Sequence, residues 1–208
     1  MQSHIVPRHP LQESARLAAE VVNTGGVVLI PTDTCYGLSA GAAAAEAIRR
    51  VEKLKGREGK PFNVLLKDVA ALERVATSLP PCFERLRGVL VPGPLTLVVR
   101  SEKLSFSSDG TLAVRVPRNE FLEAVMEKVR EEGIISTSAN PSGGAEPYAL
   151  DDVAKAILQG VDLSVDAGRL PPTPPSSILD LTKEPPALLR EGAVSRARIE
   201  EVLRTAVA

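Results

Sequence analysis

Short runs of Val, Leu and Ile recur along this chain and alternate with stretches whose apolar residues have a helical spacing. The runs at Val27 to Ile30, Leu95 to Val99 and Leu112 to Val116 are short and rich in β-branched residues, which is typical of buried strands. Leu11 to Val22 has its apolar residues on one side of a helix, and a further helix is expected from Asn119 to Glu132. This alternation predicts an α/β fold.

The composition limits what the core and the partners of the chain can be. Aromatic residues make up only 3% of the 208 residues and Trp is absent, so Val, Leu, Ala and Ile must fill the core. The length suits one large domain or two small ones, and Ser195 is expected to cap a C-terminal helix. The net charge of −1 argues against a chain coated in basic charge for nucleic-acid binding, but it leaves a local basic cleft open.

The cysteines and the N-terminal residues indicate the cellular compartment in which the protein is expected. Cys35 and Cys82 form no CxxC pair and no metal-ligand cluster, so a reduced cytoplasmic setting is expected and no metal site is predicted. The apolar runs are too short to cross a bilayer, and the N-terminal residues lack the apolar stretch of a signal peptide. His4 and His9 are the only histidines and fall in an expected N-terminal tail, so a Cys–His catalytic pair is not favoured.

Polar residues follow two of the predicted strands. Thr32 to Gly37 comes directly after the strand that Pro31 ends, and Ser136 to Gly143 follows the apolar pair Ile134-Ile135. Each segment is consistent with a wall of a polar ligand site, because ligands bind at strand ends in open α/β sheets. Each is also consistent with an ordinary turn rich in Ser, Thr, Asn and Gly.

Lysine and arginine cluster between residues 53 and 60. Lys55, Arg57 and Lys60 surround the glycine expected to end a helix, where they could neutralise phosphate or carboxylate oxygens. A solvated helix end explains the same cluster equally simply. The segment is not a P-loop, because the order GxxxxGK[ST] is absent.

Two arginines raise a separate question. Arg115 interrupts the apolar strand Leu112 to Val116, where a charge is costly unless it is paired. It either meets a structural carboxylate or binds an anionic ligand in a cleft, and Arg190 after Leu188-Leu189 poses the same choice.

Seven segments in this order resemble the YrdC/Sua5 family: PTDTCYGL, KLKGREGKP, PGPLTLVV, LAVRVP, STSANPSG, PSSILDL and LLREGA. The resemblance covers about Leu11 to Arg190. It implies a single domain over residues 1–208, with a core from about 11 to 190 and a C-terminal helix from about 195 to 205. It implies a twisted, largely mixed open sheet with flanking helices around a deep basic cleft, in the short, single-domain branch. It also implies an L-threonylcarbamoyladenylate synthase, a nucleotidyltransferase that makes threonylcarbamoyl-AMP and pyrophosphate from L-threonine, bicarbonate or CO2, and ATP. Mg²⁺ is expected with the ATP, and a downstream tRNA threonylcarbamoyl-transferase complex is the expected partner.

The resemblance also implies roles for residues at matching positions. The expected catalytic residues are Lys55, Arg57, Ser138 and Asn140, and the expected L-threonine contacts are Thr34, Arg115, Ser136 and Ser176. The expected nucleotide contacts are Arg57, Lys60, Thr111, Ser138, Asn140 and Arg190. Leu65 departs from the family because some members carry a polar residue there, and residues 143–147 form a slightly longer segment than usual.

Two other functions fit parts of this pattern. The first is a non-catalytic module of the same fold that binds double-stranded RNA or a ribosomal element, and a direct RNA contact is left open. The second is a carbamoyl-transferring enzyme of hydrogenase maturation, whose large extra domains with zinc-ligand cysteines have no counterpart in this sequence.

Overall fold

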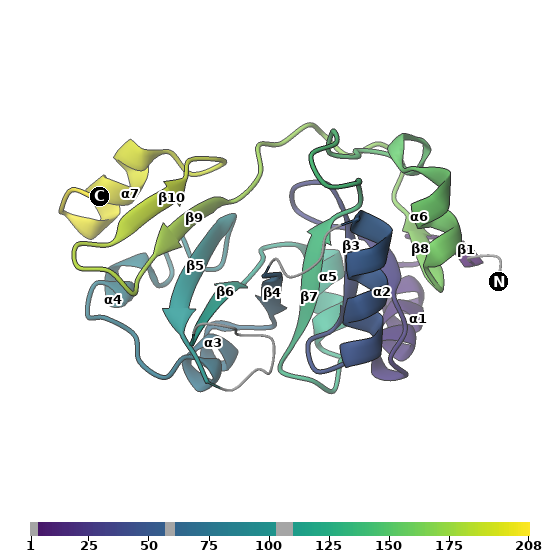
Figure 1. Ribbon diagram of the computed structural model, residues 1–208, viewed down its shortest axis with the longest axis horizontal. Helices are drawn as coiled ribbons and strands as arrows, with labels where there is room; N and C mark the ends of the chain where they lie inside the picture. The colour runs from purple at the N-terminus through teal and green to yellow at the C-terminus, as the bar shows by residue number, and fades with distance from the viewer. Residues whose placement is uncertain (1–3, 57–60, 103–109) are drawn as a thin grey trace.

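Ten strands of the described residues join into one mixed sheet that extends across the molecule (Figure 1). The computed structural model describes residues 4–56, 61–102 and 110–208. The strand order is β1-β8-β2-β3-β7-β4-β6-β5-β9-β10. Parallel pairs such as β4 with β6 occur beside antiparallel pairs such as β3 with β7, so the predicted mixed α/β sheet with flanking helices is confirmed.

The elements have the following bounds. The strands are β1 (His4–Pro7), β2 (Val28–Pro31), β3 (Tyr36–Gly41), β4 (Asn63–Leu66), β5 (Leu95–Arg100), β6 (Thr111–Arg115), β7 (Gly133–Ser138), β8 (Leu163–Asp166), β9 (Ser177–Asp180) and β10 (Ala187–Arg190). The helices are α1 (Leu11–Asn23), α2 (Ala45–Lys55), α3 (Val69–Val75), α4 (Phe83–Leu86), α5 (Glu120–Met126), α6 (Lys155–Gly160) and α7 (Arg196–Leu203), with a 3₁₀ turn at Leu150–Asp152.

Helices cover both faces of the sheet near β2. Val28 and Ile30 pack in a cluster with the apolar side chains of α1 and α5, whereas Leu29 packs in a cluster with α2 and α6. Successive side chains of a strand point to opposite faces, so both faces are buried there. A third cluster joins β5 and β6 to α3, α4 and α7 at the other end of the molecule (Figure 1).

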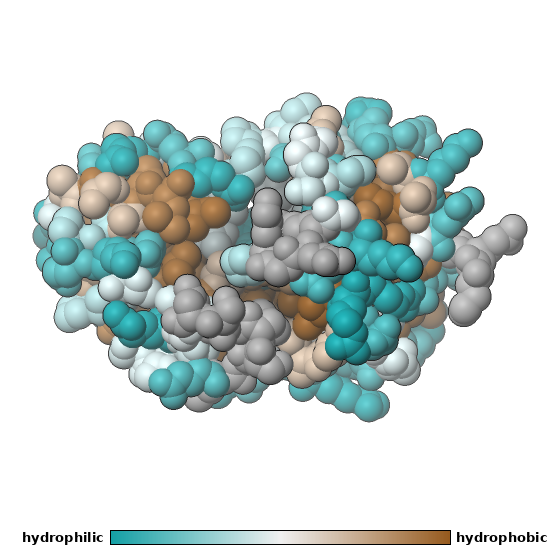
Figure 2. Space-filling view, in the orientation of Figure 1, coloured by the Kyte–Doolittle hydropathy of each residue, from teal (hydrophilic) through white to brown (hydrophobic). Residues whose placement is uncertain are grey.

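The surface of the molecule also differs between the end that holds α2 and the end that holds β9 and β10 (Figure 2). Hydrophilic side chains cover the outer face of α2, and apolar side chains show over β9 and β10 (Figure 2). Leu189 on β10 is 60% exposed. In the described ranges, every helix is too short or too polar to cross a membrane.

One predicted helix is shorter than expected. The prediction ran from Asn119 to Glu132, but α5 ends at Met126. Asn119 caps its start by accepting a hydrogen bond from the Leu122 amide, as its type suggests. The amide side chain of Asn23 then bonds both to the Lys128 carbonyl and to the Arg130 N–H, and these contacts hold the chain in a turn.

Two strands were not predicted. Residues 4–7 are not a tail but strand β1, which pairs in parallel with β8 at the edge of the sheet. The segment Thr32 to Gly37 is a loop only as far as Cys35, because β3 begins at Tyr36. Small residues such as Gly37, Ser39 and Gly41 give β3 no strand pattern, and pairing with β2 and β7 on its two sides forms it instead.

Candidate active site

A cavity of about 450 Å³ lies on the sheet where β7, β4, β6 and β5 are neighbours. The register places Ser136 beside Asn63, Asn63 beside Ala113, and Ala113 beside Val98, and all four residues line the cavity. One row across four strands therefore forms its floor. The volume is in the range of small-molecule sites.

The other described lining residues include hydroxyls, two cations and one carboxylate. They are Thr32, Thr34, Cys35, Gly37, Pro61, Phe62, Thr96, Arg115, Thr137, Ser138, Glu146, Pro175, Ser176, Ile178, Leu189 and Arg190. The loop after β2, the end of β7, and the chain leading into β9 and β10 supply most of them, so segments distant in sequence converge here.

The loop after β2 is a turn that also forms a cavity wall. The Thr32 hydroxyl donates to the Cys35 carbonyl at 2.7 Å and accepts from the amides of Thr34 and Cys35. Its oxygen lies 3.1 Å from the Thr34 hydroxyl oxygen. The turn and the substrate wall, which the sequence offered as alternatives, are the same structure.

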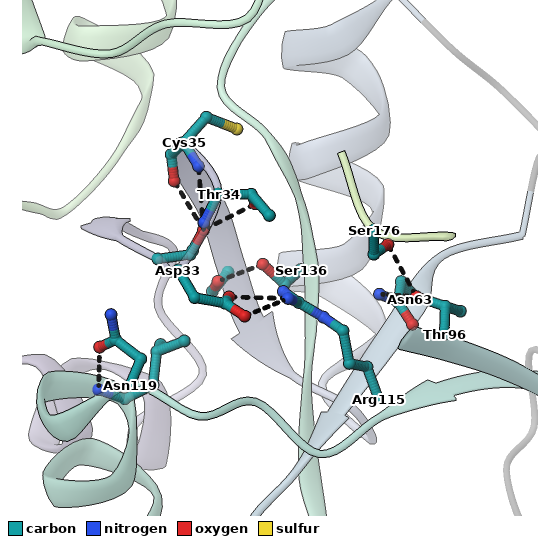
Figure 3. Close-up of polar contacts among 12 residues, drawn as sticks. Asp33, Thr34, Cys35, Asn63, Thr96, Arg115, Asn119, Ser136 and Ser176 are labelled. Atoms are coloured by element: carbon teal, nitrogen blue, oxygen red, sulfur yellow. Dashed lines mark hydrogen bonds and ion pairs between the residues drawn. The ribbon is translucent and has the colours of Figure 1, made fainter. Parts of the chain in front are cut away.

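Arg115 projects from the end of β6 and forms an ion pair with Asp33 of that loop (Figure 3). Its Nη1 donates to both carboxylate oxygens, each at 2.7 Å, and the side chain is 5% exposed. A carboxylate of this chain therefore satisfies the charge, and burial of Arg115 alone does not require an anionic ligand. Its Nε has no hydrogen-bond partner among the described residues, and Arg115 lines the cavity.

Lys55 occupies a different place from the one expected. It is 4% exposed at the end of α2, and its ammonium donates to the main-chain oxygens of Ser138 at 2.5 Å and Asn140 at 2.8 Å. The ammonium of Lys55 is therefore occupied by direct contacts with these two residues, whereas the sequence analysis expected it to neutralise phosphate or carboxylate oxygens. The helix ends at Gly56, whose φ of 59° is the left-handed conformation that glycine favours.

The end of β7 and the loop after it divide into a part that lines the cavity and a part that supports it. Ser136 and Ser138 line the cavity, and the Ser39 hydroxyl donates to the Ser136 oxygen at 3.2 Å. Asn140 is 8% exposed, and its Nδ2 donates to the Gly144 carbonyl at 2.5 Å. Asn140 and Lys55 are not among the described lining residues, and their contacts fix the loop that follows Ser138.

Three expected nucleotide contacts have no observed place on the described part of the cavity wall. Arg57 and Lys60 lie outside the described residues. Thr111 is at the opposite end of β6 from Arg115 and is not among the described lining residues.

Arg190 and Ser176 begin a hydrogen-bond chain along the cavity. Arg190 donates to the Ser176 carbonyl from Nε at 3.0 Å and from Nη2 at 2.8 Å. The Ser176 hydroxyl oxygen lies 2.9 Å from that of Thr96, to which Asn63 Nδ2 donates at 3.3 Å (Figure 3). Burial lowers the pKa of Arg190, Glu146 opposes this shift, and Arg115 adds to it.

Three residues of the cavity, Asn63, Thr96 and Glu146, were not predicted from the sequence to have a binding or catalytic role. Asn63 and Thr96 are polar residues in otherwise apolar strands, which was the available signal. Leu65, where some family members carry a polar residue, is fully buried in the core and is not among the described lining residues.

Cys35 lines the cavity, but its thiol is not poised for attack. Burial, and next the charge of Glu146, raise its pKa to about 12. His4 lies on the edge strand β1, far along the sheet order from the cavity strands. Among the described residues, no group of three or more His, Cys, Asp or Glu side chains is arranged to hold a metal ion.

The mixed sheet and its flanking helices define an α/β protein, and its polar, charged cavity has the size of a small-molecule site. The sequence model of the Sua5/YciO/YrdC family, described as "Telomere recombination", matches residues 20–192, and the chain belongs to this family.

Two relatives and one solved structure show how the chain compares within the family. It is 35% identical over 193 residues to the threonylcarbamoyl-AMP synthase of Pyrococcus abyssi, covering 90% of this chain but only 56% of that protein. It is 33% identical over 202 residues to a putative threonylcarbamoyl-AMP synthase of Mycobacterium tuberculosis, covering 93% of this chain and 92% of that one. The crystal structure of P. abyssi Sua5 complexed with L-threonine superposes with a TM-score of 0.89 and 30% identity, covering 100% of this chain and 62% of that one.

Proposed function

We propose that this protein is an L-threonylcarbamoyladenylate synthase, a nucleotidyltransferase. It makes threonylcarbamoyl-AMP and pyrophosphate from L-threonine, bicarbonate or CO2, and ATP, for threonylcarbamoyladenosine modification of tRNA. The observation that carries the proposal is the cavity in which Arg115, Arg190 and a set of hydroxyls converge. The relative of known structure with the same fold was crystallised with L-threonine, which supports an amino acid as the occupant.

The proposed chemistry has two steps and needs no covalent bond to the protein. The ammonium group of threonine first gives up a proton to become an amine, whose nitrogen attacks the carbon of CO2. Loss of a second proton from that nitrogen to solvent leaves a carbamate. A carbamate oxygen then attacks the α-phosphorus of ATP, and pyrophosphate leaves with the electrons of the broken P–O bond. The second step brings two anions together, so cations that face the carbamate and the phosphates lower its barrier.

The threonine side of the site is assigned to Thr34, Arg115, Ser136 and Ser176. A guanidinium binds a carboxylate strongly, and Arg115 has an Nε without a described partner even though Asp33 occupies its Nη1. Thr34 and Ser136 both carry hydroxyl groups and line the cavity, so they are suited to hydrogen bonds with the substrate hydroxyl.

The nucleotide side is assigned to Ser138 and Arg190, both on the cavity, together with Arg57, Lys60 and Thr111. Lys55 and Asn140 are assigned a supporting role, because their contacts hold Ser138 and the loop after it. Mg²⁺ is proposed to enter with ATP on its phosphate oxygens, since the described residues offer no carboxylate cluster to hold it alone.

The proposed setting is the cytoplasm, with a tRNA threonylcarbamoyl-transferase complex consuming the product. A cavity of about 450 Å³ lined by hydroxyls suits a small ligand better than the surface of a duplex, so we favour synthesis over RNA binding as the primary function.

Mass spectrometry tests the proposal directly. The protein is incubated with ATP, Mg²⁺, bicarbonate and L-threonine, and the mixture is analysed for threonylcarbamoyl-AMP. Carbon from ¹³C-bicarbonate should appear in the carbamoyl group. Salt-sensitive RNA binding without any such product would support the RNA-binding module instead.

A further inference from the structure

Glu146 is the one carboxylate among the described residues that line the cavity, and neither the resemblance nor the mechanism above uses it. We propose that Glu146 binds the ammonium group of the amino-acid substrate, while the arginine side of the cavity binds its carboxylate. The inference rests on the proposed function and explains how the site recognises a zwitterion rather than a simple carboxylic acid.

Hydrogen bonds on both sides of Glu146 hold its loop in place. The Pro147 carbonyl accepts from the Tyr36 amide of β3 at 2.9 Å, and the Tyr148 carbonyl accepts from the Leu170 amide at 2.7 Å. Before Glu146, the Gly144 carbonyl accepts from the Asn140 side chain at 2.5 Å. The carboxylate therefore projects from a backbone that is fixed without any ligand.

The charge of Glu146 is not neutralised by the described part of the chain. Its Oε2 accepts one hydrogen bond from the Tyr148 hydroxyl at 3.4 Å, and no described Lys or Arg forms an ion pair with it. The charge of Asp33, by contrast, is neutralised, because Nη1 of Arg115 lies 2.7 Å from its carboxylate oxygen. A half-buried carboxylate without a cation is a favourable position for a cationic group of a ligand.

The charges of Glu146 and Arg115 affect the pKa values of the same two cavity residues, Cys35 and Arg190. Glu146 raises the pKa of Cys35, second to burial, whereas Arg115 lowers it. It also counteracts the effects of burial and of Arg115 on the pKa of Arg190. Opposite charges that face one cavity match the opposite ends of an amino acid. A metal cation is less well matched, because Mg²⁺ takes several oxygen ligands in octahedral geometry.

Calorimetric titration of two ligands tests the assignment. The ligands are L-threonine and (R)-3-hydroxybutanoate, which keeps the carboxylate and hydroxyl but lacks the amino group. They are titrated into the wild type, Glu146→Gln and Glu127→Gln, in EDTA without ATP. Glu127 is exposed on the outside of the molecule and serves as the matched control. Glu146→Gln keeps an oxygen for Tyr148, and circular dichroism checks that it folds.

We expect Glu146→Gln to weaken L-threonine binding about tenfold or more, because a charge-assisted hydrogen bond is lost. Binding of (R)-3-hydroxybutanoate should stay the same or improve, and Glu127→Gln should match the wild type. Two results would overturn the assignment: equal L-threonine affinity in Glu146→Gln and the wild type, or an equal loss of affinity for both ligands. Either result would leave the proposed function intact. A difference seen only when Mg²⁺ replaces EDTA would assign Glu146 to a metal instead. A wild type that binds no L-threonine would contradict the proposed function itself.

Discussion

Nη1 of Arg115 lies 2.7 Å from each carboxylate oxygen of Asp33, although the two residues are 82 positions apart in sequence. The ion pair is almost fully buried and ties the loop after β2 to the end of β6 (Figure 3). Two walls of the cavity are therefore fixed to each other before any ligand arrives. Arg115 keeps its orientation through Asp33, which is how a binding site is organised in advance.

Replacement of Arg115 by Lys tests the carboxylate assignment. Lys keeps the charge and can still pair with Asp33, but it cannot present several N–H groups in a plane. We expect the KM for L-threonine to rise about tenfold, equivalent to about 1.4 kcal/mol of binding, with a smaller change in kcat. Steady-state kinetics with varied L-threonine measure this. Arg118→Lys is the control, because Arg118 is exposed and lies only three residues further along the chain. An unchanged KM for L-threonine in Arg115→Lys would show that Arg115 does not bind the amino acid.

Lys55 is expected to matter for stability as well as for activity. Lys55→Met keeps the apolar stem but leaves the carbonyls of Ser138 and Asn140 without their donor. The free energy of unfolding should fall by about 3 kcal/mol, in the range of lost hydrogen bonds to a buried charge. Urea unfolding followed by circular dichroism measures it.

Lys53→Met is the matched control for this experiment. Lys53 is in the same turn of α2 but is exposed, so its replacement should change the unfolding free energy by less than about 0.5 kcal/mol. Equal stability of the two variants would mean that the buried ammonium does not hold the end of β7. The alternative from the sequence analysis, a solvated helix end, would then account for Lys55 better.

Cys35 should react slowly with alkylating agents near neutral pH. Its pKa of about 12 leaves almost no thiolate at pH 8, and the rate with iodoacetamide should rise about tenfold per pH unit up to that value. Because the folded pKa is above the ordinary 9.0, protonated Cys35 stabilises the fold below pH 9, and this contribution is lost as the pH rises toward 12. Mass spectrometry of the Cys35 peptide follows the reaction, and rapid labelling at pH 7 would contradict the assignment of a buried, neutral thiol.

Much of the sheet could be predicted because its strands are apolar runs bounded by turn residues. The predicted strand at Val27 to Ile30 is β2, shifted by one residue, and the predicted helix at Leu11 to Val22 is α1 with one more residue. Strand β3 could not be predicted, because its pairing partners rather than its own residues make it a strand. The end of α5 likewise depends on Asn23, which is distant in sequence.

The site was harder to predict than the fold. The sequence identified Arg115 as a buried charge but could not say that Asp33 is its partner, because pairing across 82 residues depends on the assembled sheet. It identified Lys55 as basic but not as buried. Glu146 lies in a loop segment without a periodic pattern, so only the folded chain brings it to the cavity.

Pyrophosphate release from ATP tests the central claim most directly. The wild-type protein is assayed with Mg²⁺ and ATP in four mixtures: complete, without L-threonine, without bicarbonate in CO2-depleted buffer, and with L-valine in place of L-threonine. The account predicts release in the complete mixture only, with little from L-valine because it lacks the hydroxyl that the polar cavity wall would bind. Equal release without any amino acid, or no release in the complete mixture, would contradict it.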